Sequence, residues 1–291
     1  MSVSTIPARE VEHLVAAGAE TGEGPLWDDR EQVLWWVDIP RRALHRFDPA
    51  TGHDSMREVS QMAGAVALRE AGGLVLAVQE GFALLGDRDL EMIAAVEADR
   101  PDMRMNDGYC DARGRFWAGT MPLGRRGPFG GLYRLDADRR VTTMLTGVGT
   151  SNGIDWSPDG RTMYYIDSYL QTVDAFDVEP QSGELGDRRT LVRYTPEGGH
   201  GDGLVVDAEG HLWVALWGGS AVHRYSPAGE LELVIELPAT QVTKPAFGGP
   251  DLEDLYITTA AARHPEEPQA GDLFRVRGLG VRGQRINRYL G

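Results

Sequence analysis

Apolar runs of strand length, separated by turn-forming residues, fill nearly the whole chain. Typical runs are LWWVDI, FWAGTM, MYYIDS and LWVALW, and the runs that follow them end in turns such as DPATG, DVEPQSG and SPAGE. Runs this short do not form amphipathic helices, and the 37 glycines and 16 prolines fall largely between them. The pattern predicts antiparallel strands joined by tight turns, with almost no helix.

One position recurs at the head of the first apolar run in each unit, and it is usually polar. When the units are aligned on the turn that follows, this position holds, in chain order, Glu23, Gly64, Asn106, Asn152, Asp202 and Lys244, with Gly64 in the weakest copy. Neighbouring copies are 41 to 50 residues apart. A period of this length with several short strands per unit is typical of β-propellers.

The six units predict an all-β fold: a six-bladed β-propeller with a central metal site, forming a single domain over residues 1–291. The segment VEHLVAA, residues 11–17, precedes the first full unit and is expected to close the ring by joining the last blade. The irregular C-terminal segment, residues 275–291, leaves the seam of the ring less certain. The competing architecture is a two-sheet sandwich, which would not need the same polar position in every unit.

The aligned polar positions predict a ring of side chains. The first strand of each propeller blade lies nearest the axis, so Glu23, Asn106, Asn152, Asp202 and Lys244 should converge at one end of the channel. Two carboxylates and amide carbonyls are hard oxygen donors that suit Ca²⁺, Mg²⁺, Mn²⁺ or Fe²⁺. Their small number leaves coordination positions for water or substrate, which favours a catalytic cation. Alternatively, these groups hydrogen-bond channel water or cap exposed backbone groups.

Composition narrows the classes of partner. A net charge of −15 without a basic patch argues against nucleic-acid binding. No apolar run reaches the roughly 18 residues of a membrane span, and the N-terminus lacks the pattern of a signal peptide. We therefore expect a cytoplasmic protein without membrane contact. The single cysteine, Cys110, fits a reducing compartment and is expected to be a buried small side chain rather than a nucleophile.

Two residues resemble catalytic groups. Ser151 lies in GTSNG, which matches the G-x-S-x-G motif of serine hydrolases, but that motif needs a strand-turn-helix context and here the chain continues as a strand. We therefore do not expect Ser151 to be a nucleophile. His200 precedes Asp202 by two residues and is a candidate for proton transfer, although a loop histidine is more often merely solvated.

Five motifs together resemble the regucalcin/gluconolactonase (senescence marker protein) family of six-bladed propeller lactonases, particularly its bacterial sugar lactonases. They are GEGPLW (22–27), RMNDGYCDARGRFWAGTM (104–121), SNGIDWSPDGRTMYYIDS (151–168), GDGLVVDAEGHLWVALWGG (201–219) and VTKPAFGGPDLEDLYITTA (242–260). The resemblance implies a divalent cation held by Glu23, Asn152 and Asp202. It also implies that Arg104 and Asn106 bind sugar hydroxyls. One loop departs from the family pattern: where relatives often carry an acidic side chain, residues 122–126 read PLGRR, which puts the substrate contacts made there in doubt.

The resemblance predicts metal-dependent hydrolysis of an aldonolactone to the aldonic acid, with Asp202 as both cation ligand and general base. Ca²⁺ is the first choice of cation, with Zn²⁺, Mn²⁺, Mg²⁺ and Fe²⁺ as alternatives. The expected partner is a small sugar lactone, and the expected assembly is a monomer or weak homo-oligomer. The alternatives are a non-catalytic calcium-binding regulator, a protein-binding scaffold, and a hydrolase of other esters or organophosphates. The role of Lys244, at the channel or on substrate, stays open.

Overall fold

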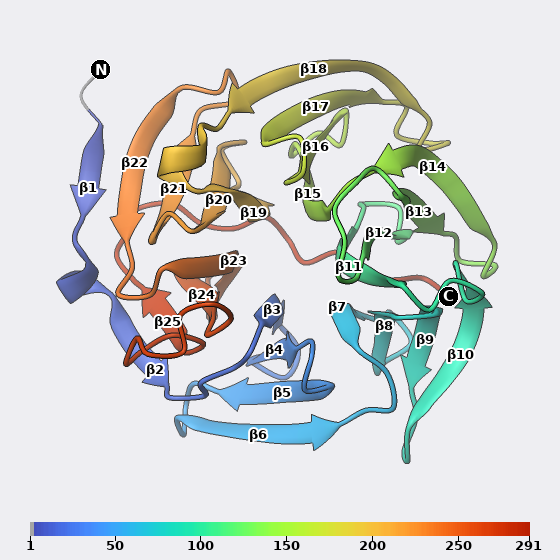
Figure 1. Cartoon of the computed structure of the whole chain (residues 1–291), viewed down its shortest axis with the longest axis horizontal. Coiled ribbons are helices and arrows are strands. Elements are labelled where there is room, and N and C mark those ends of the chain that lie inside the picture. The colour runs from blue at the N-terminus through green and yellow to red at the C-terminus, as the bar shows by residue number, and fades with distance from the viewer. Residues whose placement is uncertain (1–2) are drawn as a thin grey trace.

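The regular structure of the protein is almost entirely β-sheet. The computed structural model describes residues 3–291, and the only helices among them are two 3₁₀ turns, η1 (Ala8–Glu10) and η2 (Pro196–Gly198). Figure 1 shows the sheets arranged around a centre, with one or two strands of each sheet innermost and the following strands farther out. The all-β prediction is confirmed.

Four of the sheets contain four antiparallel strands each, and in each one the chain passes from strand to neighbouring strand without a crossover. Their strands are β3 (Gly22–Asp28), β4 (Val33–Asp38), β5 (Ala43–Asp48), β6 (His53–Glu58); β7 (Ala63–Leu68), β8 (Leu74–Val78), β9 (Gly81–Leu85), β10 (Leu90–Ala95); β11 (Met103–Cys110), β12 (Phe116–Pro122), β13 (Gly130–Leu135), β14 (Val141–Val148); β15 (Ser151–Trp156), β16 (Thr162–Asp167), β17 (Thr172–Val178) and β18 (Leu185–Arg193).

A fifth sheet joins the two ends of the chain. Its strands are β1 (Ser4–Ile6), β2 (Glu12–Val15), β19 (His200–Val206), β20 (Leu212–Trp217), β21 (Ala221–Tyr225), β22 (Leu231–Glu236), β23 (Gln241–Gly248), β24 (Asp254–Ala260) and β25 (Leu273–Val276). Strand β2 pairs antiparallel with β25, and β1 pairs parallel with β22. The predicted joining of residues 11–17 to the last strands is therefore confirmed.

The fifth sheet has nine strands because its two halves touch at one residue pair, Trp217 of β20 with Gln241 of β23. Five sheets are thus assigned where the sequence predicts six units, and the blade count stays a prediction. Separate sheets around a centre differ from the two stacked layers of a sandwich and agree with a propeller.

Each innermost strand is interrupted at the recurrent position. The pairing of β3, β7, β11, β15, β19 and β23 with the following strand shifts register between residues 23 and 26, 63 and 65, 105 and 108, 151 and 154, 201 and 204, and 242 and 244. A β-bulge leaves residues outside the ladder and re-aims their side chains. The six aligned positions lie in these interruptions or at their edges, which frees their side chains from the faces of the sheets.

Two positions of the innermost strands require glycine, one because another strand is close and one because of its backbone conformation. A Cβ at Gly64 would lie 2.3 Å from the carbonyl oxygen of Asn106, so the weakest copy of the repeat has no room for a side chain. Gly24 follows Glu23 directly and has φ +54°, a left-handed conformation that glycine adopts without strain.

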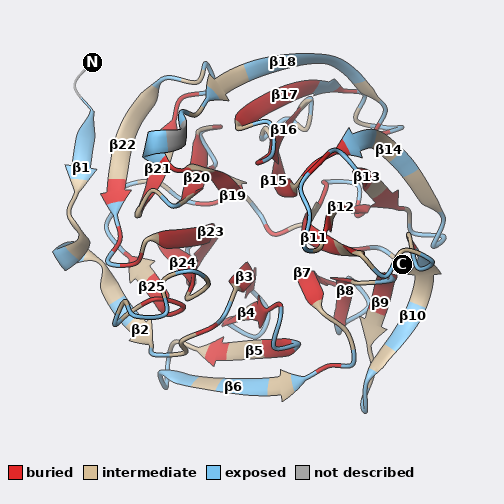
Figure 2. Cartoon of the chain, in the orientation of Figure 1, coloured by how far each residue is buried: buried red, intermediate tan, exposed pale blue. Residues whose placement is uncertain are grey.

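The hydrophobic core lies between neighbouring sheets. Innermost strands such as β3 and β23 are buried along their full length, whereas the outer strand β18 is mostly exposed. Figure 2 shows this gradient from buried centre to exposed rim. One cluster joins Ile166 and Ala175 of one sheet to Leu204 and Val214 of the next. Each sheet therefore buries both faces against its neighbours, which explains the long apolar runs in the sequence.

The C-terminal strap, residues 282–291, crosses one end of the channel instead of forming a strand. Figure 1 shows this segment passing behind the inner strands toward the C-terminus. Its hydrogen-bond partners come from all five sheets or the turns next to them and are Asp29, Leu68, Arg69, Glu70, Cys110, Gly114, Asp136, Trp156, Val206, Ala208 and Leu252. The irregular pattern that made the seam uncertain belongs to a segment that links the sheets.

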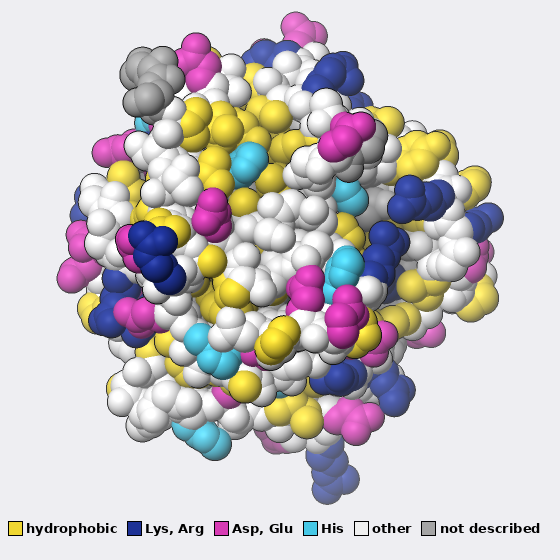
Figure 3. All heavy atoms as spheres, turned by 60° about the vertical axis from the view of Figure 1, so that its left-hand side comes forward, with side chains coloured by type: hydrophobic (Ala, Val, Ile, Leu, Met, Phe, Trp, Pro, Cys, Tyr) yellow, Lys and Arg dark blue, Asp and Glu magenta, His cyan; other side chains and the backbone are white. Residues whose placement is uncertain are grey.

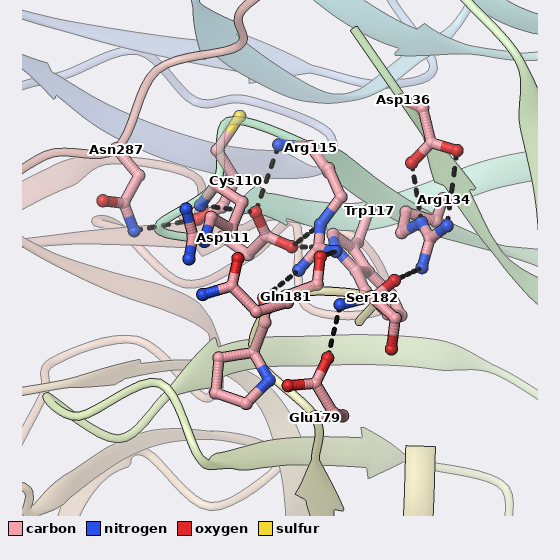
Figure 4. A network of polar contacts seen from close by, with 12 residues as sticks. Cys110, Asp111, Arg115, Trp117, Arg134, Asp136, Glu179, Gln181, Ser182 and Asn287 are labelled. Carbon is pink, nitrogen blue, oxygen red and sulfur yellow. Dashed lines mark hydrogen bonds and ion pairs between the residues drawn. The ribbon is translucent and has the colours of Figure 1, made fainter. Parts of the chain in front are cut away.

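Figure 4 shows one of these contacts, in which Asn287 donates to the Cys110 carbonyl (3.1 Å). Beside it, Asp111 accepts hydrogen bonds from the side chains of Arg115 (2.5 Å) and Trp117 (2.8 Å). Arg115 also donates to the Gln181 carbonyl in the next sheet (3.1 Å). Cys110 itself is buried, as expected, and burial raises the pKa of its thiol well above the usual range.

Acidic and basic side chains are interspersed on the face seen in Figure 3. Within residues 3–291 we find no helix with the length and apolarity needed to cross a lipid bilayer.

Candidate functional site

The five predicted site residues line a single cavity of about 630 Å³. It lies where the innermost strands begin and the second strands end, and its lining includes Glu23, Arg104, Asn106, Asn152 and Asp202. A second cavity, of about 820 Å³, is lined by turns at the other ends of these strands and by the C-terminal strap. The two cavities share no lining residue.

Two carboxylates form part of the first cavity's wall. Glu23 and Asp202 are 3% and 5% exposed, respectively. Glu23 accepts a hydrogen bond from the Gly24 amide (2.7 Å), and within residues 3–291 no cationic side chain forms an ion pair with either carboxylate. Burial raises the pKa of Glu23 to about 8, and the charge of Asp107 adds to the shift. Burial, followed by the charge of Glu23, raises the pKa of Asp202 well above its usual range.

A chain of hydrogen bonds orders the amides beside these carboxylates. Arg104 donates to the Asn106 side-chain oxygen (2.6 Å), and the Asn106 Nδ2 donates to the Asn152 Oδ1 (2.8 Å). Asn152 in turn donates from Nδ2 to Ser168 Oγ (2.8 Å), which donates to the Gly201 carbonyl (2.6 Å). The chain fixes which atom of each amide is oxygen, and it ends one residue before Asp202.

This arrangement fits a divalent cation. Two buried carboxylates without a positive partner are costly in a metal-free protein, because each disfavours ionisation of the other. A cation between them would remove that penalty, and the fixed Asn152 carbonyl is a third oxygen donor. Arg104 does not take this role: burial lowers its pKa to about 10, yet it stays charged and forms no ion pair with these carboxylates.

Lys244 lies outside the cavity lining. Although it occupies the aligned position of β23, its ammonium group pairs with Asp107, and both side chains are buried. Asp107 is the residue after Asn106 on β11, so the ion pair is next to the chain of hydrogen-bonded amides in sequence. Of the two roles left open by the sequence, contact with Asp107 points to stabilisation of the channel.

Of the two remaining candidates, His200 reaches the cavity and Ser151 does not. His200 lines the cavity, and burial lowers its pKa, with the charges of Arg126 and Arg263 adding to the effect. Ser151 is fully buried, and its Oγ accepts a hydrogen bond from the Tyr165 hydroxyl (2.8 Å), so it is no exposed nucleophile.

A second acidic group lies elsewhere. Potential ligand atoms of Asp207, Glu209 and His211 lie within 4.8 Å of one another on the turn after β19. Arg224 donates to both Asp207 (3.0 Å) and Glu209 (2.9 Å), and the Trp213 indole donates to Asp207 (2.9 Å). Arg224 offsets part of the negative charge, and both oxygens of Asp207 accept hydrogen bonds from the protein, which favours a structural role for this group.

Sequence reasoning missed Ser168 and two arginines, Arg126 and Arg263, that line the same cavity as His200. Ser168 ends the IDS run after β16, and only its position at the close of the second strand could have indicated that it reaches the cavity. Arg126 and Arg263 come from loops that carry no periodic signal.

Comparison with known proteins gives consistent matches. The sequence profile of the SMP-30/gluconolactonase/LRE-like region matches residues 21–261. Regucalcin from Xenopus laevis is 38% identical over 287 residues, covering 94% of this chain and 96% of that protein. YvrE from Bacillus subtilis (strain 168), assigned as a sugar lactone lactonase, is 39% identical over 264 residues and covers 88% and 90%. The crystal structure of regucalcin from Agrobacterium tumefaciens, described as a calcium-binding protein, superposes with a TM-score of 0.94 at 30% identity, covering 99% of each chain.

Proposed function

Because the chain belongs to the SMP-30/gluconolactonase/LRE-like family, we propose that it hydrolyses a sugar lactone to the aldonic acid with the help of one divalent cation. The observation that carries the proposal is the convergence of Glu23, Asn152 and Asp202 on one cavity that also exposes Arg104 and Asn106. We further propose that the nine-stranded sheet consists of two blades joined at the Trp217–Gln241 pair, which makes the chain a single six-bladed propeller domain.

Glu23, Asn152 and Asp202 would hold the cation, and Ca²⁺, our first choice, suits their all-oxygen donor set. When bound, the cation supplies Lewis-acid polarisation of the lactone carbonyl. Asp202 accepts a proton from the water that attacks the carbonyl carbon. The attacking oxygen bonds to the carbonyl carbon to give a tetrahedral intermediate. The bond from that carbon to the ring oxygen then breaks, and the proton passes from Asp202 to the departing ring oxygen. Arg104 and Asn106 orient the sugar hydroxyls so that the carbonyl faces Asp202.

The proposal is tested by measuring acid release from a panel of pentono- and hexonolactones. The protein is first stripped of metal with a chelator, and single metals are then added back. We expect a rate above spontaneous hydrolysis that returns with one divalent cation. Binding of Ca²⁺ without turnover of any lactone would instead indicate a non-catalytic calcium-binding protein, a function that the description of the A. tumefaciens relative makes the second candidate.

Ser168→Ala is expected to weaken cation binding by about 10- to 100-fold, because outer-shell partners that orient ligands have effects of this size. The substitution removes the hydroxyl that joins Asn152 to the Gly201 carbonyl. Calorimetric titration of the chelated protein measures the change. Ser60→Ala, an exposed serine outside the cavity lining, is the matched control and should bind as the wild type. An unchanged affinity in Ser168→Ala would contradict the role of this chain of hydrogen bonds.

The metal-free protein is expected to lose stability as pH rises. Because the pKa of Glu23 is raised from 4.5 to about 8, the native state holds a proton that the unfolded state releases earlier. The contribution is fully present below pH 4.5 and is lost as pH rises through about 8. Glu23→Gln should reduce this loss by an amount on the order of a few kcal/mol.

Urea unfolding in chelator at pH 5 and pH 8 provides the measurement. Glu91→Gln, at an exposed position on β10, is the control and should follow the wild type. Equal pH dependence in wild type and Glu23→Gln would show that the Glu23 carboxyl is not the group that titrates.

A further inference from the structure

The mouth of the cavity is positively charged, although the chain as a whole carries a net charge of −15. The acidic residues of the lining are Glu23 and Asp202, which the proposed cation would neutralise. The basic residues of the lining are Arg104, Arg125, Arg126 and Arg263, together with His200. With the cation in place, the cavity therefore has an excess of positive charge.

Not all of these arginines are free to meet a ligand. Arg125 forms an ion pair with Asp102 and stacks over the ring of Phe129, 4.1 Å from its centroid. Arg104 is held among the amides of the floor. Arg126 and Arg263 are exposed, and within residues 3–291 no carboxylate forms an ion pair with either.

Two separate loops bring these two arginines to the same place. Arg126 lies in the loop between β12 and β13, and Arg263 lies in the loop between β24 and β25. Both arginines line the same cavity, together with His200. Guanidinium groups bind carboxylates and phosphates through paired, charge-assisted hydrogen bonds. Two unpaired guanidinium groups over a small-molecule cavity thus form a receptor for an anion.

The floor and the mouth of the cavity differ in chemistry. The floor carries the oxygen donors and the hydroxyl-binding groups, so the lactone ring lies there under the proposed function. A substituent on the ring carbon remote from the lactone carbonyl would extend toward the arginines. The acidic side chain that the resemblance leads us to expect in the 122–126 loop would repel an anion at this position, whereas Arg126 attracts one.

We infer that the preferred substrate is a sugar lactone that carries an anionic group, a carboxylate or a phosphate, at the end remote from the lactone carbonyl. This inference rests on the proposed lactonase function and adds the charge of the substrate to it. Arg126 and Arg263 bind the anionic group.

The experiment compares three hexono-1,5-lactones that differ only at C6, which is a hydroxymethyl group, a carboxylate or a phosphorylated hydroxymethyl group. We expect kcat/KM for at least one anionic lactone to exceed that for the neutral lactone by about tenfold or more, mainly through a lower KM. Comparison of the carboxylate with the phosphate identifies which anion the cavity takes. The advantage of the anionic lactone should shrink as salt is added.

The double variant Arg126→Gln/Arg263→Gln should lower kcat/KM for the anionic lactone about tenfold relative to the neutral one. Arg88→Gln, at an exposed arginine outside both cavities, is the control and should leave the ratio unchanged. Hydrolysis of the neutral lactone at an equal or higher kcat/KM, or an equal loss for all three lactones in the double variant, overturns the inference and leaves the lactonase proposal intact. Absence of metal-dependent hydrolysis with all three overturns both.

Discussion

Asp202→Ala is expected to reduce metal-dependent lactone hydrolysis by about 10³-fold or more and to weaken cation binding at the same time. The carboxylate has two roles in the proposed reaction, as ligand and as proton acceptor, and no other carboxylate than Glu23 lines the described cavity. If Asp202 has only one of these roles, only the corresponding quantity, the hydrolysis rate or the cation affinity, should change. Initial rates and calorimetric cation binding are measured on the same protein samples.

Asp187→Ala is the matched control, since Asp187 is exposed on β18. It should leave both the rate and the cation affinity unchanged. An Asp202→Ala protein with full activity would rule out the reaction scheme, and one that still binds the cation tightly without turnover would restrict Asp202 to proton transfer.

Asn106→Ala is expected to affect cation binding as well as substrate binding. From the resemblance, the substitution should mainly raise KM. The structure adds that Asn106 donates to the Asn152 Oδ1, an atom proposed to hold the cation. We therefore expect a raised KM accompanied by a weaker cation affinity, and saturation with added cation should recover only the second effect.

The second large effect is expected from the C-terminal strap. Tyr289→Ala should lower the free energy of unfolding by about 3 to 5 kcal/mol, the range for removing a buried aromatic side chain. Tyr289 has no exposed surface, its amide donates to the Leu68 carbonyl, and its hydroxyl donates to the Asp136 carbonyl (2.9 Å). The substitution thus removes packing and one of the two hydrogen bonds that the Asp136 carbonyl accepts.

Chemical denaturation measures this loss. Leu290→Ala is the control next to it, because the Leu290 side chain is 57% exposed, and it should change stability by no more than about 0.5 kcal/mol. Equal effects of the two substitutions would show that the strap contributes little to folding.

The repeat in the sequence predicts four of the side chains that line the cavity. Glu23, Asn106, Asn152 and Asp202 are far apart along the chain, yet alignment on the turns placed them at one position of the innermost strands. The glycine in the weakest copy also has a structural reason, the approach of the Asn106 backbone to Gly64. Residues at the same position of aligned repeat units lie at the same position of the innermost strands, so the alignment predicts which of them face the centre.

Other features depend on contacts that no local pattern reports. Lys244 occupies the aligned position, but its side chain pairs with Asp107 and does not line the cavity. Ser168 reaches the site from the end of a second strand, outside the repeat position. The strap is irregular in sequence because its hydrogen bonds are spread over all five sheets and the turns next to them, so no single period governs it.

The strap places the contacts that close the ring at one end of the channel, away from the loops that line the cavity. Its partners lie at the turn ends of the inner strands, and none of them lines the cavity that contains Glu23 and Asp202. The loops that carry Arg126 and Arg263 lie at the other end and make no contact with the strap through hydrogen bonds. Mutations that alter those loops can therefore change which lactone is accepted while the ring stays closed, so new specificities can arise in this protein without loss of its fold.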